Sequence, residues 1–365
     1  MSRPVALAIA VIATLALTAG PAEAGAKRST KVTVMTRNLY LGTDLIPIAT
    51  QPTEAAFEQA ATRGFNNVKA TSFRKRAILL TREIKRGRPD LIGLQEVALW
   101  RTGPKDGIRS NERAVAFDWL ALLRRALGRA GLRYRVGGVQ REFDFSAPSS
   151  AGFDLRLTMR DAILVKRRPG LRVLRSHGDN FRKLLTFPIP GLGVTVPVKR
   201  GWVYADMKLG RRRFRFLDTH LEAYGASFRL AQARELIASG GPARSGRRLI
   251  LVGDLNSDPN GNPNGMGDPA PYNALTSFGL RDTWRLVHPV SKGYECCLKH
   301  IGADGLPDLR DPPPFPADHR IDHVLIKGRV RALAAHRVGL DPRNRTASGL
   351  WPSDHGGVVT TLRLR

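Results

Sequence analysis

Cysteine is almost absent from this sequence. The 365 residues include only two, Cys296 and Cys297, and these are adjacent. A framework of several disulfides is therefore excluded. The pair could form a vicinal disulfide that stiffens its loop, or could remain reduced. A zinc site built on both thiols and His300 is disfavoured, because no second thiolate pair exists to complete a closed shell.

Long hydrophobic runs are also rare. The most prominent one, Val5–Leu17, follows Arg3 and precedes Ala22–Ala24, which is the three-part plan of a secretory signal peptide. A membrane-spanning helix needs about 20 apolar residues, so this run is too short to be a good one. An uncleaved N-terminal anchor is the alternative. We expect residues 1–24 to be a signal peptide and the mature chain to be soluble and secreted.

The remaining chain lacks a Ser/Gly-rich linker, an internal repeat or a compositional break that would divide it. We therefore expect a single folded domain over residues 30–365. Two stretches rich in Pro, Gly and Asp, Asn260–Pro271 and Gly302–Asp318, are expected to be long loops. No feature implies a stable protein partner.

Acidic residues are in short supply. The chain has 31 Asp and Glu against 59 Lys and Arg, a formal net charge of +28. Such an excess suits an anionic partner, either nucleic acid or an acidic membrane surface. Arginine nevertheless dominates along the whole chain, so a general compositional bias explains much of it. The runs Arg211–Arg213 and Arg244–Arg248 each precede a predicted strand and indicate solvated turns rather than a phosphate track.

The sequence does contain a series of polar clusters, each beside an apolar run. These runs look like buried or half-buried strands, and polar groups at strand ends can converge at one edge of a sheet. Asn38 follows Val32–Met35, Glu96 follows Leu91–Leu94, His220 follows Phe214–Leu217, Asp254 and Asn256 follow Leu249–Val252, Asp322 precedes Val324–Ile326, and Asp354 and His355 precede Gly356–Leu364.

The clusters are rich in hard oxygen donors. The carboxylates of Glu96, Asp254 and Asp354 and the amide oxygens of Asn38 and Asn256 are the ligands that Mg²⁺, Mn²⁺ or Ca²⁺ prefer, and they suit zinc or copper poorly. We expect a magnesium-type ion. Such an ion neutralises phosphate oxygens, so two or three protein carboxylates with open water positions suffice for phosphoester hydrolysis.

Acid–base groups accompany these donors. Asp254 and Asn256 lie two residues apart, so on an extended segment both side chains point the same way and can position water and a phosphate oxygen. Asp322 and His355 can form the carboxylate and imidazole pair that activates water. His220 remains as a second imidazole that can donate a hydrogen bond to the phosphoryl group. Taken singly, each residue also fits an ordinary turn.

The order of predicted elements favours a layered α/β sandwich over a doubly wound sheet. A long helical region, Thr53–Arg86, separates the strands Val32–Asn38 and Leu91–Val97, and a second helix is predicted over Asn111–Leu127. The later predicted elements are strands at Tyr134–Val139 and Asp161–Lys166, and then strands at Arg172–His177, Val203–Leu209 and Phe214–Thr219. These last three follow one another without helices, which suggests antiparallel pairing, and a helix is predicted next at Ser227–Ala238.

Taken together, the clusters from Met35-Thr36-Arg37-Asn38 to Ser353-Asp354-His355 resemble the endonuclease/exonuclease/phosphatase superfamily, which is related to DNase I, AP endonucleases and bacterial sphingomyelinases. The resemblance covers nearly all of the mature chain. It implies a DNase I-like fold, a four-layered α/β sandwich with two central mixed β-sheets and a Mg²⁺ site at their edge. It also implies metal-site positions at Asn38, Glu96 and Asp354, a water-positioning pair at Asp254 and Asn256, and a catalytic His355 oriented by Asp322, with His220 as the histidine of the Thr-His strand.

The substrate is less narrowly defined. Secretion favours a nuclease, with nucleic acid as substrate, or a sphingomyelinase-like phosphodiesterase acting on anionic or choline phospholipid. The segment Leu184–Val198 could be an apolar hairpin that touches membrane or an ordinary buried edge hairpin. Arg160, just before a predicted strand, is a candidate for contacting phosphate. A non-catalytic secreted binding module on the same fold is a further alternative, although no catalytic group is missing.

Overall fold

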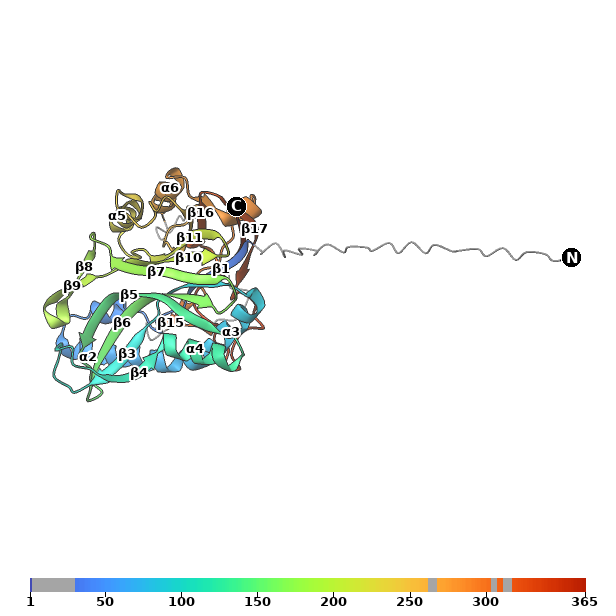
Figure 1. The fold of residues 1–365 in the computed structure, drawn as a ribbon. Coiled ribbons are helices and arrows are strands. Elements are labelled where there is room, and N and C mark those ends of the chain that lie inside the picture. The colour runs from blue at the N-terminus through green and yellow to red at the C-terminus, as the bar shows by residue number, and fades with distance from the viewer. Residues whose placement is uncertain (2–29, 262–267, 303–306, 311–316) are drawn as a thin grey trace.

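Two mixed sheets form the centre of the molecule. The computed structural model describes Met1 and residues 30–261, 268–302, 307–310 and 317–365. Beyond Met1, the expected signal peptide lies outside the described residues, as do parts of the two predicted loops. Helices cover the outer faces of both sheets (Figure 1), so the predicted four-layered α/β sandwich is confirmed.

The first sheet contains the chain's first and last long strands. Its members are β1 (Lys31–Asn38), β2 (Leu91–Gln95), β3 (Leu99–Gly103), β4 (Ala114–Asp118), β5 (Tyr134–Ala147), β6 (Asp154–Lys166), β17 (Val330–Val338) and β18 (Gly357–Leu364). The order is β17-β18-β1-β2-β6-β3-β4, with β5 beside β6. Only the β1–β2 pair is parallel, and helices link these two strands as the sequence predicts.

The second sheet is built from the middle of the chain and has the order β13-β16-β12-β11-β10-β7. Its strands are β7 (Leu171–Asn180), β10 (Gly201–Leu209), β11 (Arg212–His220), β12 (Arg248–Asp254), β13 (Arg281–Asp282) and β16 (Asp322–Lys327). The expected antiparallel pairing of β7, β10 and β11 is confirmed, and β11 and β12 are parallel.

The core between the sheets is made of aliphatic and aromatic side chains from both inner faces, including Val34, Phe216 and Val252. The sheets approach closely at Gly93. A Cβ there would lie 2.4 Å from Val252 Cγ2 and 2.5 Å from Asp218 Oδ1, so only glycine fits between these neighbours.

Helices complete the outer layers. The first sheet is covered by α2 (Glu54–Ala70), α3 (Phe73–Gly87) and α4 (Trp119–Arg129), and the second by α5 (Ala226–Ile237) and α6 (Ala270–Ser277) (Figure 1). Shorter elements are α1 (Ile46–Ala49), α7 (Thr283–Val287), the 3₁₀ turn Pro190–Leu192, and the two-residue strands β14 (His300–Ile301) and β15 (Pro307–Asp308). Among the described residues, no helix is long and apolar enough to cross a membrane.

Two helix predictions were wrong in detail. The region Thr53–Arg86 is two helices, because Ser72 takes a left-handed conformation (φ 38°) that interrupts the helix. The first half of Asn111–Leu127 contains β4, which pairs with β3, and the helix begins only after Asp118, whose carboxylate caps it. In both cases the periodic pattern of apolar residues continues across the break in the helix, so the pattern does not reveal the break.

The predicted hairpin is present as β8 (Leu185–Ile189) and β9 (Val194–Val198). Its apolar residues alternate with exposed Thr and Pro and are half-buried or buried. Val194 and Val196 pack against the core of the first sheet. The apolar face therefore lies on the domain, as in the edge-hairpin alternative.

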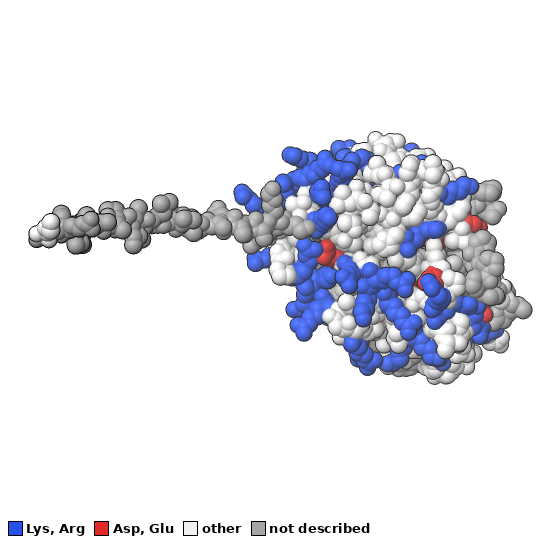
Figure 2. Space-filling model, turned by 90° about the vertical axis from the view of Figure 1, so that its right-hand side faces the viewer, with Lys and Arg blue, Asp and Glu red and all other residues white. Residues whose placement is uncertain are grey.

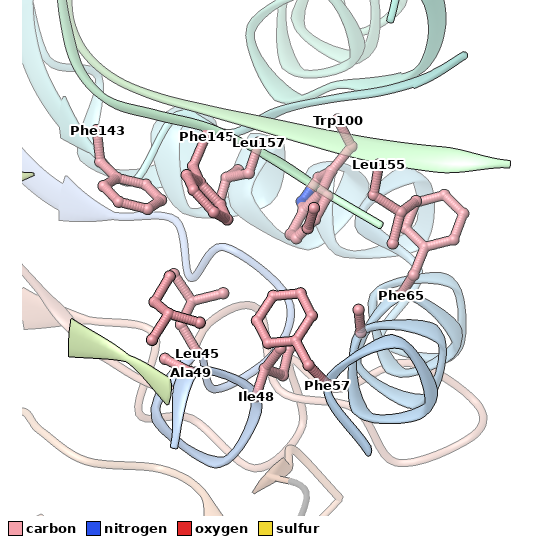
Figure 3. Close-up of a pocket in the computed structure, with 13 residues that line it drawn as sticks. Leu45, Ile48, Ala49, Phe57, Phe65, Trp100, Phe143, Phe145, Leu155 and Leu157 are labelled. Atoms are coloured by element: carbon pink, nitrogen blue, oxygen red, sulfur yellow. The ribbon is translucent and has the colours of Figure 1, made fainter. Parts of the chain in front are cut away.

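An apolar pocket of about 70 Å³ lies beside this hairpin (Figure 3). Ile48 and Phe57 line one side, and Trp100, Phe143 and Phe145 line the other. Among the residues that the structure describes, no charged side chain lines it.

Lysine and arginine gather at one end of the sandwich. In Figure 1, β1 and β17 lie on the right-hand side of the molecule. Figure 2 shows the molecule from that side, and basic side chains far outnumber acidic ones on this face. The strand ends here carry Lys31 on β1, Arg212 on β11, Arg248 on β12 and Arg363 on β18. Burial lowers the pKa of Arg248, and the neighbouring charges of Arg212 and Arg329 lower it further.

Candidate active site

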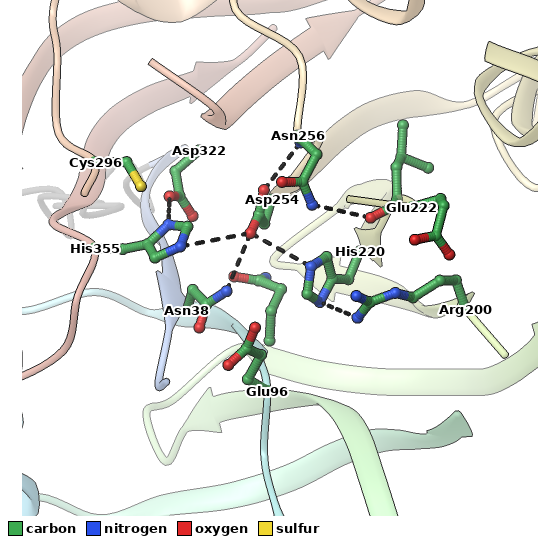
Figure 4. Close-up of polar contacts among 12 residues, drawn as sticks. Asn38, Glu96, Arg200, His220, Glu222, Asp254, Asn256, Cys296, Asp322 and His355 are labelled. Atoms are coloured by element: carbon green, nitrogen blue, oxygen red, sulfur yellow. Dashed lines mark hydrogen bonds and ion pairs between the residues drawn. The ribbon is translucent and has the colours of Figure 1, made fainter. Parts of the chain in front are cut away.

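The opposite ends of the same strands bring the predicted polar residues together (Figure 4). His220 ends β11, Asp254 ends β12 and Asp322 begins β16, and these three residues are direct neighbours in the strand register. Asn38 ends β1 in the other sheet, and its Nδ2 donates to Asp254 Oδ2 at 3.0 Å. The site therefore bridges the two sheets at one edge, as expected for polar groups that terminate buried strands.

Asp254 is the hub of the cluster. Besides Asn38, its Oδ2 lies 3.4 Å from His220 Nε2 and 3.9 Å from His355 Nε2. Its Oδ1 accepts from the backbone N–H of Asn256 at 2.9 Å. The Asn256 side-chain amide donates to the Leu221 carbonyl at 3.0 Å. One carboxylate thus faces both imidazoles, and its loop is held by local hydrogen bonds.

His355 and Asp322 form the predicted pair. Nδ1 of His355 lies 2.7 Å from Asp322 Oδ2, and both side chains are buried. Burial opposes a charge on the ring, but Asp322 and Asp354 outweigh it and raise the pKa of His355 well above its usual range. Burial raises the pKa of Asp322 to about 6, although His355 opposes this. An imidazole that shares a proton with a neighbouring carboxylate in this way is suited to act as a general base, and the carboxylate orients its ring.

Glu295 supports this pair, and the sequence reasoning missed it. Its Oε1 accepts from the backbone N–H groups of Ile321 and Asp322 at 2.6 and 2.8 Å, and its carbonyl accepts from Gly356 N–H at 2.6 Å. Burial and Asp322 raise the pKa of Glu295 well above its usual range. This one residue ties the segments before Asp322 and after His355 together.

The second imidazole has a different partner. Nδ1 of His220 lies 3.1 Å from Nη1 of Arg200, a buried residue that immediately precedes β10. Burial, Arg200 and His355 lower the pKa of His220 well below its usual range. Arg200 also lies 4.0 Å from Glu142 Oε2. Sequence reasoning did not single out Arg200, because one more arginine is inconspicuous in a chain so rich in them.

Glu96 and Asp354 form an acidic pair beside Asn38. Burial and the charge of Asp354 raise the pKa of Glu96. Oε2 of Glu96 accepts from Leu41 N–H at 2.7 Å, and Asp354 Oδ2 lies 2.7 Å from Lys299 Nζ. Two carboxylates and the amide oxygen of Asn38 are hard oxygen donors, the kind that a divalent cation prefers.

A second acidic group lies behind His220. Glu142 and Asp161 are buried, and their carboxylate oxygens and a ring nitrogen of His220 lie within 4.8 Å of one another. Burial raises the pKa of Glu142 to about 7 and, with Glu142, that of Asp161 well above its usual range. Both ring nitrogens of His220 already face Arg200 or Asp254. Asp354 likewise pairs with Lys299, so both groups already have protein partners. The group containing Glu96 and Asp354 is preferred because its donors are all hard oxygens.

The structure places Arg160 outside this cluster's contacts. Its Nη2 pairs with Asp118 Oδ1 at 2.6 Å, and its Nε donates to the Val97 carbonyl at 2.9 Å. These bonds anchor the segment that follows Glu96. A phosphate contact by Arg160 stays a prediction.

The two cysteines form a disulfide next to His355. The backbone of Cys296 bridges to His319 and to His355, and Leu298 N–H donates to the Asp354 carbonyl. Arg37 holds the same segment from the other side, donating to the carbonyls of His355 and Gly356 at 2.5 and 2.8 Å. The loop that carries Lys299 is thereby fixed beside the acidic pair.

Comparisons with known proteins identify the family and the fold. The Endonuclease/Exonuclease/phosphatase family model matches residues 55–355. A comparison with curated proteins finds no match. Among solved structures, an endonuclease/exonuclease/phosphatase from Bacteroides vulgatus is similar over 92% of this chain and 99% of its own, with 18% identity and a TM-score of 0.53.

Two further solved structures share the fold. D. rerio TDP2 complexed with single strand DNA product covers 91% of this chain and 99% of its own, with 15% identity and a TM-score of 0.51. A mannosyl-6-phosphatase from Bacteroides thetaiotaomicron covers 91% and 99%, with 18% identity and a TM-score of 0.50. The family match spans most of the chain and includes Glu96, His220, Asp254, Asp322 and His355, so this chain belongs to the endonuclease/exonuclease/phosphatase family.

Proposed function

We propose that this chain is a secreted, metal-dependent phosphodiesterase that hydrolyses nucleic acid by in-line attack of water. The observation that carries the proposal is Asp254, whose one carboxylate oxygen faces both His355 and His220 beside the Glu96 and Asp354 pair. Acid–base groups and cation-binding carboxylates thus share one small, mostly buried space.

Each group has a distinct role. Asp254 and His355 hold and deprotonate the attacking water, and Asp322 orients the His355 ring through its Nδ1. His220 and the amides of Asn38 and Asn256 donate hydrogen bonds to phosphate oxygens. Asn38, Glu96 and Asp354 would hold a divalent ion of the Mg²⁺ type, Mn²⁺ and Ca²⁺ being alternatives, which neutralises charge on the phosphate and the leaving oxygen.

Two side chains at the site favour a nucleotide substrate. Tyr224, two residues after Glu222, exposes 56% of its surface. Burial of its hydroxyl and the charge of Asp44 raise its pKa to about 12, and the charges of Lys299 and Arg200 oppose this. An exposed aromatic ring offers a stacking surface for a base. Lys299 supplies a positive charge beside Asp354. The D. rerio TDP2 structure, on the same fold, holds a single-stranded DNA product.

The chain's large net charge contributes less to this proposal than its size suggests. The strand ends that carry Lys31, Arg212, Arg248 and Arg363 are opposite those that carry Asn38, His220 and Asp254. A phosphate bound at Asp254 therefore does not contact this basic end. Lys299, beside Asp354, is a cation of the site itself.

A phospholipid phosphodiesterase is the second candidate, and the apolar pocket beside the β8–β9 hairpin favours it. Its volume of about 70 Å³ is less than half the ~150 Å³ of an apolar cavity that binds benzene. An acyl chain would therefore have to widen it. Because the hairpin also turns its apolar face inward, nucleic acid remains the preferred substrate.

The test is a panel of substrates given to the purified secreted chain with Mg²⁺: supercoiled plasmid, sphingomyelin vesicles and a phosphomonoester. EDTA and Asp254→Ala serve as controls, with circular dichroism to confirm that the variant folds. Plasmid nicking that both controls abolish supports the proposal. Hydrolysis of sphingomyelin alone would replace it with the second candidate, and hydrolysis of the monoester alone would contradict both.

Export is part of the proposal and has its own test. Residues 1–24 carry the pattern of a signal peptide, and residues 30–365 would be the exported catalytic domain. We expect the N-terminal sequence of protein recovered from the medium to begin at Gly25. Retention of the full chain in a membrane fraction would instead support the uncleaved anchor.

A further inference from the structure

The two histidines of the site are held by partners of opposite chemistry. Nδ1 of His355 faces a carboxylate, Asp322, at 2.7 Å, whereas Nδ1 of His220 faces a guanidinium, Arg200, at 3.1 Å (Figure 4). A carboxylate accepts hydrogen bonds, and a guanidinium only donates them. Nδ1 of His355 therefore carries a hydrogen, whereas Nδ1 of His220 must accept one.

The position of the His220 proton follows from this contact. Arginine has no acceptor and does not lose its proton in proteins, so Nδ1 of His220 must be the acceptor. A neutral ring then carries its hydrogen on Nε2, which lies 3.4 Å from Asp254 Oδ2. A second proton on Nδ1 would set two donors against each other in a buried site.

We propose that Arg200 is a positioning residue that fixes His220 as the neutral tautomer with its proton on Nε2. In this state His220 donates a hydrogen bond into the reaction space and does not act as a proton carrier. That phosphate accepts this hydrogen bond rests on the proposed function, whereas the assignment of the His220 tautomer does not.

The surroundings keep Arg200 in place. Its carbonyl accepts from Phe181 N–H at 2.9 Å, which fixes the backbone just before β10. Glu142 lies 4.0 Å from its Nη1. Burial opposes the charge of Arg200, but Glu222 and Glu142 outweigh it and raise its pKa. Arg200 is only 8% exposed, so water cannot easily replace it as the partner of His220.

Other charged groups around His220 agree with a neutral ring. Asp254 faces Nε2, Glu142 and Asp161 lie behind the ring, and His355 lies across Asp254. Burial, Arg200 and His355 lower the pKa of His220. A carboxylate opposite Nε2 is compatible with a single hydrogen on that nitrogen.

The direct test is ¹H–¹⁵N correlation NMR of the histidine rings, with His220 assigned by the signals missing in His220→Gln. We expect Nδ1 unprotonated and Nε2 protonated in the wild type from pH 5 to 8. In Arg200→Glu, where an acceptor replaces the donor, Nδ1 should gain a hydrogen. A wild-type ring that carries hydrogen on Nδ1 at pH 7 would overturn the proposal, whether or not the chain hydrolyses any substrate.

Kinetics provide the second readout. Arg200→Met should lower kcat about 10- to 100-fold with little change in KM, because it removes an arrangement needed for transition-state hydrogen bonding. Arg200→Lys, which still donates, should recover part of the loss, and Arg200→Glu should not. Arg182→Met, at an exposed arginine paired with Glu235, is the matched control. Equal losses in all three Arg200 variants with an unchanged His220 tautomer would mean that Arg200 is merely structural.

Discussion

Replacing Asp322 with asparagine tests how the site controls its base. The change keeps the size of a fully buried side chain and removes the charge that lies 2.7 Å from His355 Nδ1. A hydrogen bond to a charged group contributes about 1.5–3 kcal/mol, and each 1.4 kcal/mol corresponds to a factor of ten. We therefore expect kcat to fall about 10- to 100-fold in Asp322→Asn.

The same change should move the pH dependence. Asp322 is a main cause of the raised pKa of His355, which must be deprotonated to act as a base. In the wild type the rate should rise as pH increases through this raised pKa. Without the carboxylate the pKa falls, so the rate of Asp322→Asn should reach its lower plateau at a lower pH.

The assay is plasmid nicking at saturating Mg²⁺ across pH 5–9. Asp341→Asn is the control, because Asp341 pairs with Arg343 and Arg86 outside the site. Circular dichroism confirms that the variants fold. A pH profile of Asp322→Asn that keeps the wild-type midpoint would refute the assignment of His355 as the general base and Asp322 as its partner.

Three further outcomes are expected. His355→Ala and Asp254→Ala should each lower turnover at least 100-fold without unfolding the chain, since general base catalysis contributes about 10²–10⁴; near wild-type rates in either would contradict their roles. Lys299→Met should weaken substrate binding, seen as a higher KM, because it removes the cation beside Asp354; an unchanged KM would show that substrate does not contact it. Finally, burial and Arg320 lower the pKa of His323 to about 3, below its unfolded value near 6.5. The contribution of neutral His323 to the free energy of unfolding is complete above pH 6.5 and is lost as the pH falls toward 3. At pH 5 the free energy of unfolding should be lower by about 2 kcal/mol. Urea unfolding should show this loss in the wild type and a smaller one in His323→Gln.

Strand ends were the most informative feature of the sequence. Asp254 and Asp322 were predicted to meet because each adjoins a buried run, and the register of β12 and β16 makes them direct neighbours. The polar residue types at these strand ends do not contribute to a hydrophobic core, so their repetition predicted that they meet at one edge of the sheets. The order of strands then indicated the layered fold.

The residues that hold and charge the site from outside the strand ends could not be predicted from the sequence in this way. Arg200, Glu295 and Lys299 lie in connecting segments, where a single charged residue usually faces solvent. Their roles depend on contacts across the fold, such as Glu295 with the backbone of Asp322 and Lys299 with Asp354. The break at Ser72 was missed for a related reason, since a left-handed residue between two helices of similar pattern does not change the apolar periodicity.

The most direct test of the central claim is the stereochemistry of hydrolysis at phosphorus. A phosphorothioate diester that is chiral at phosphorus would be hydrolysed in ¹⁸O-labelled water by the wild-type chain with Mg²⁺. A single in-line attack by water, held by Asp254 and His355, predicts inversion of configuration. Retention would require a covalent intermediate on the protein and would contradict the account.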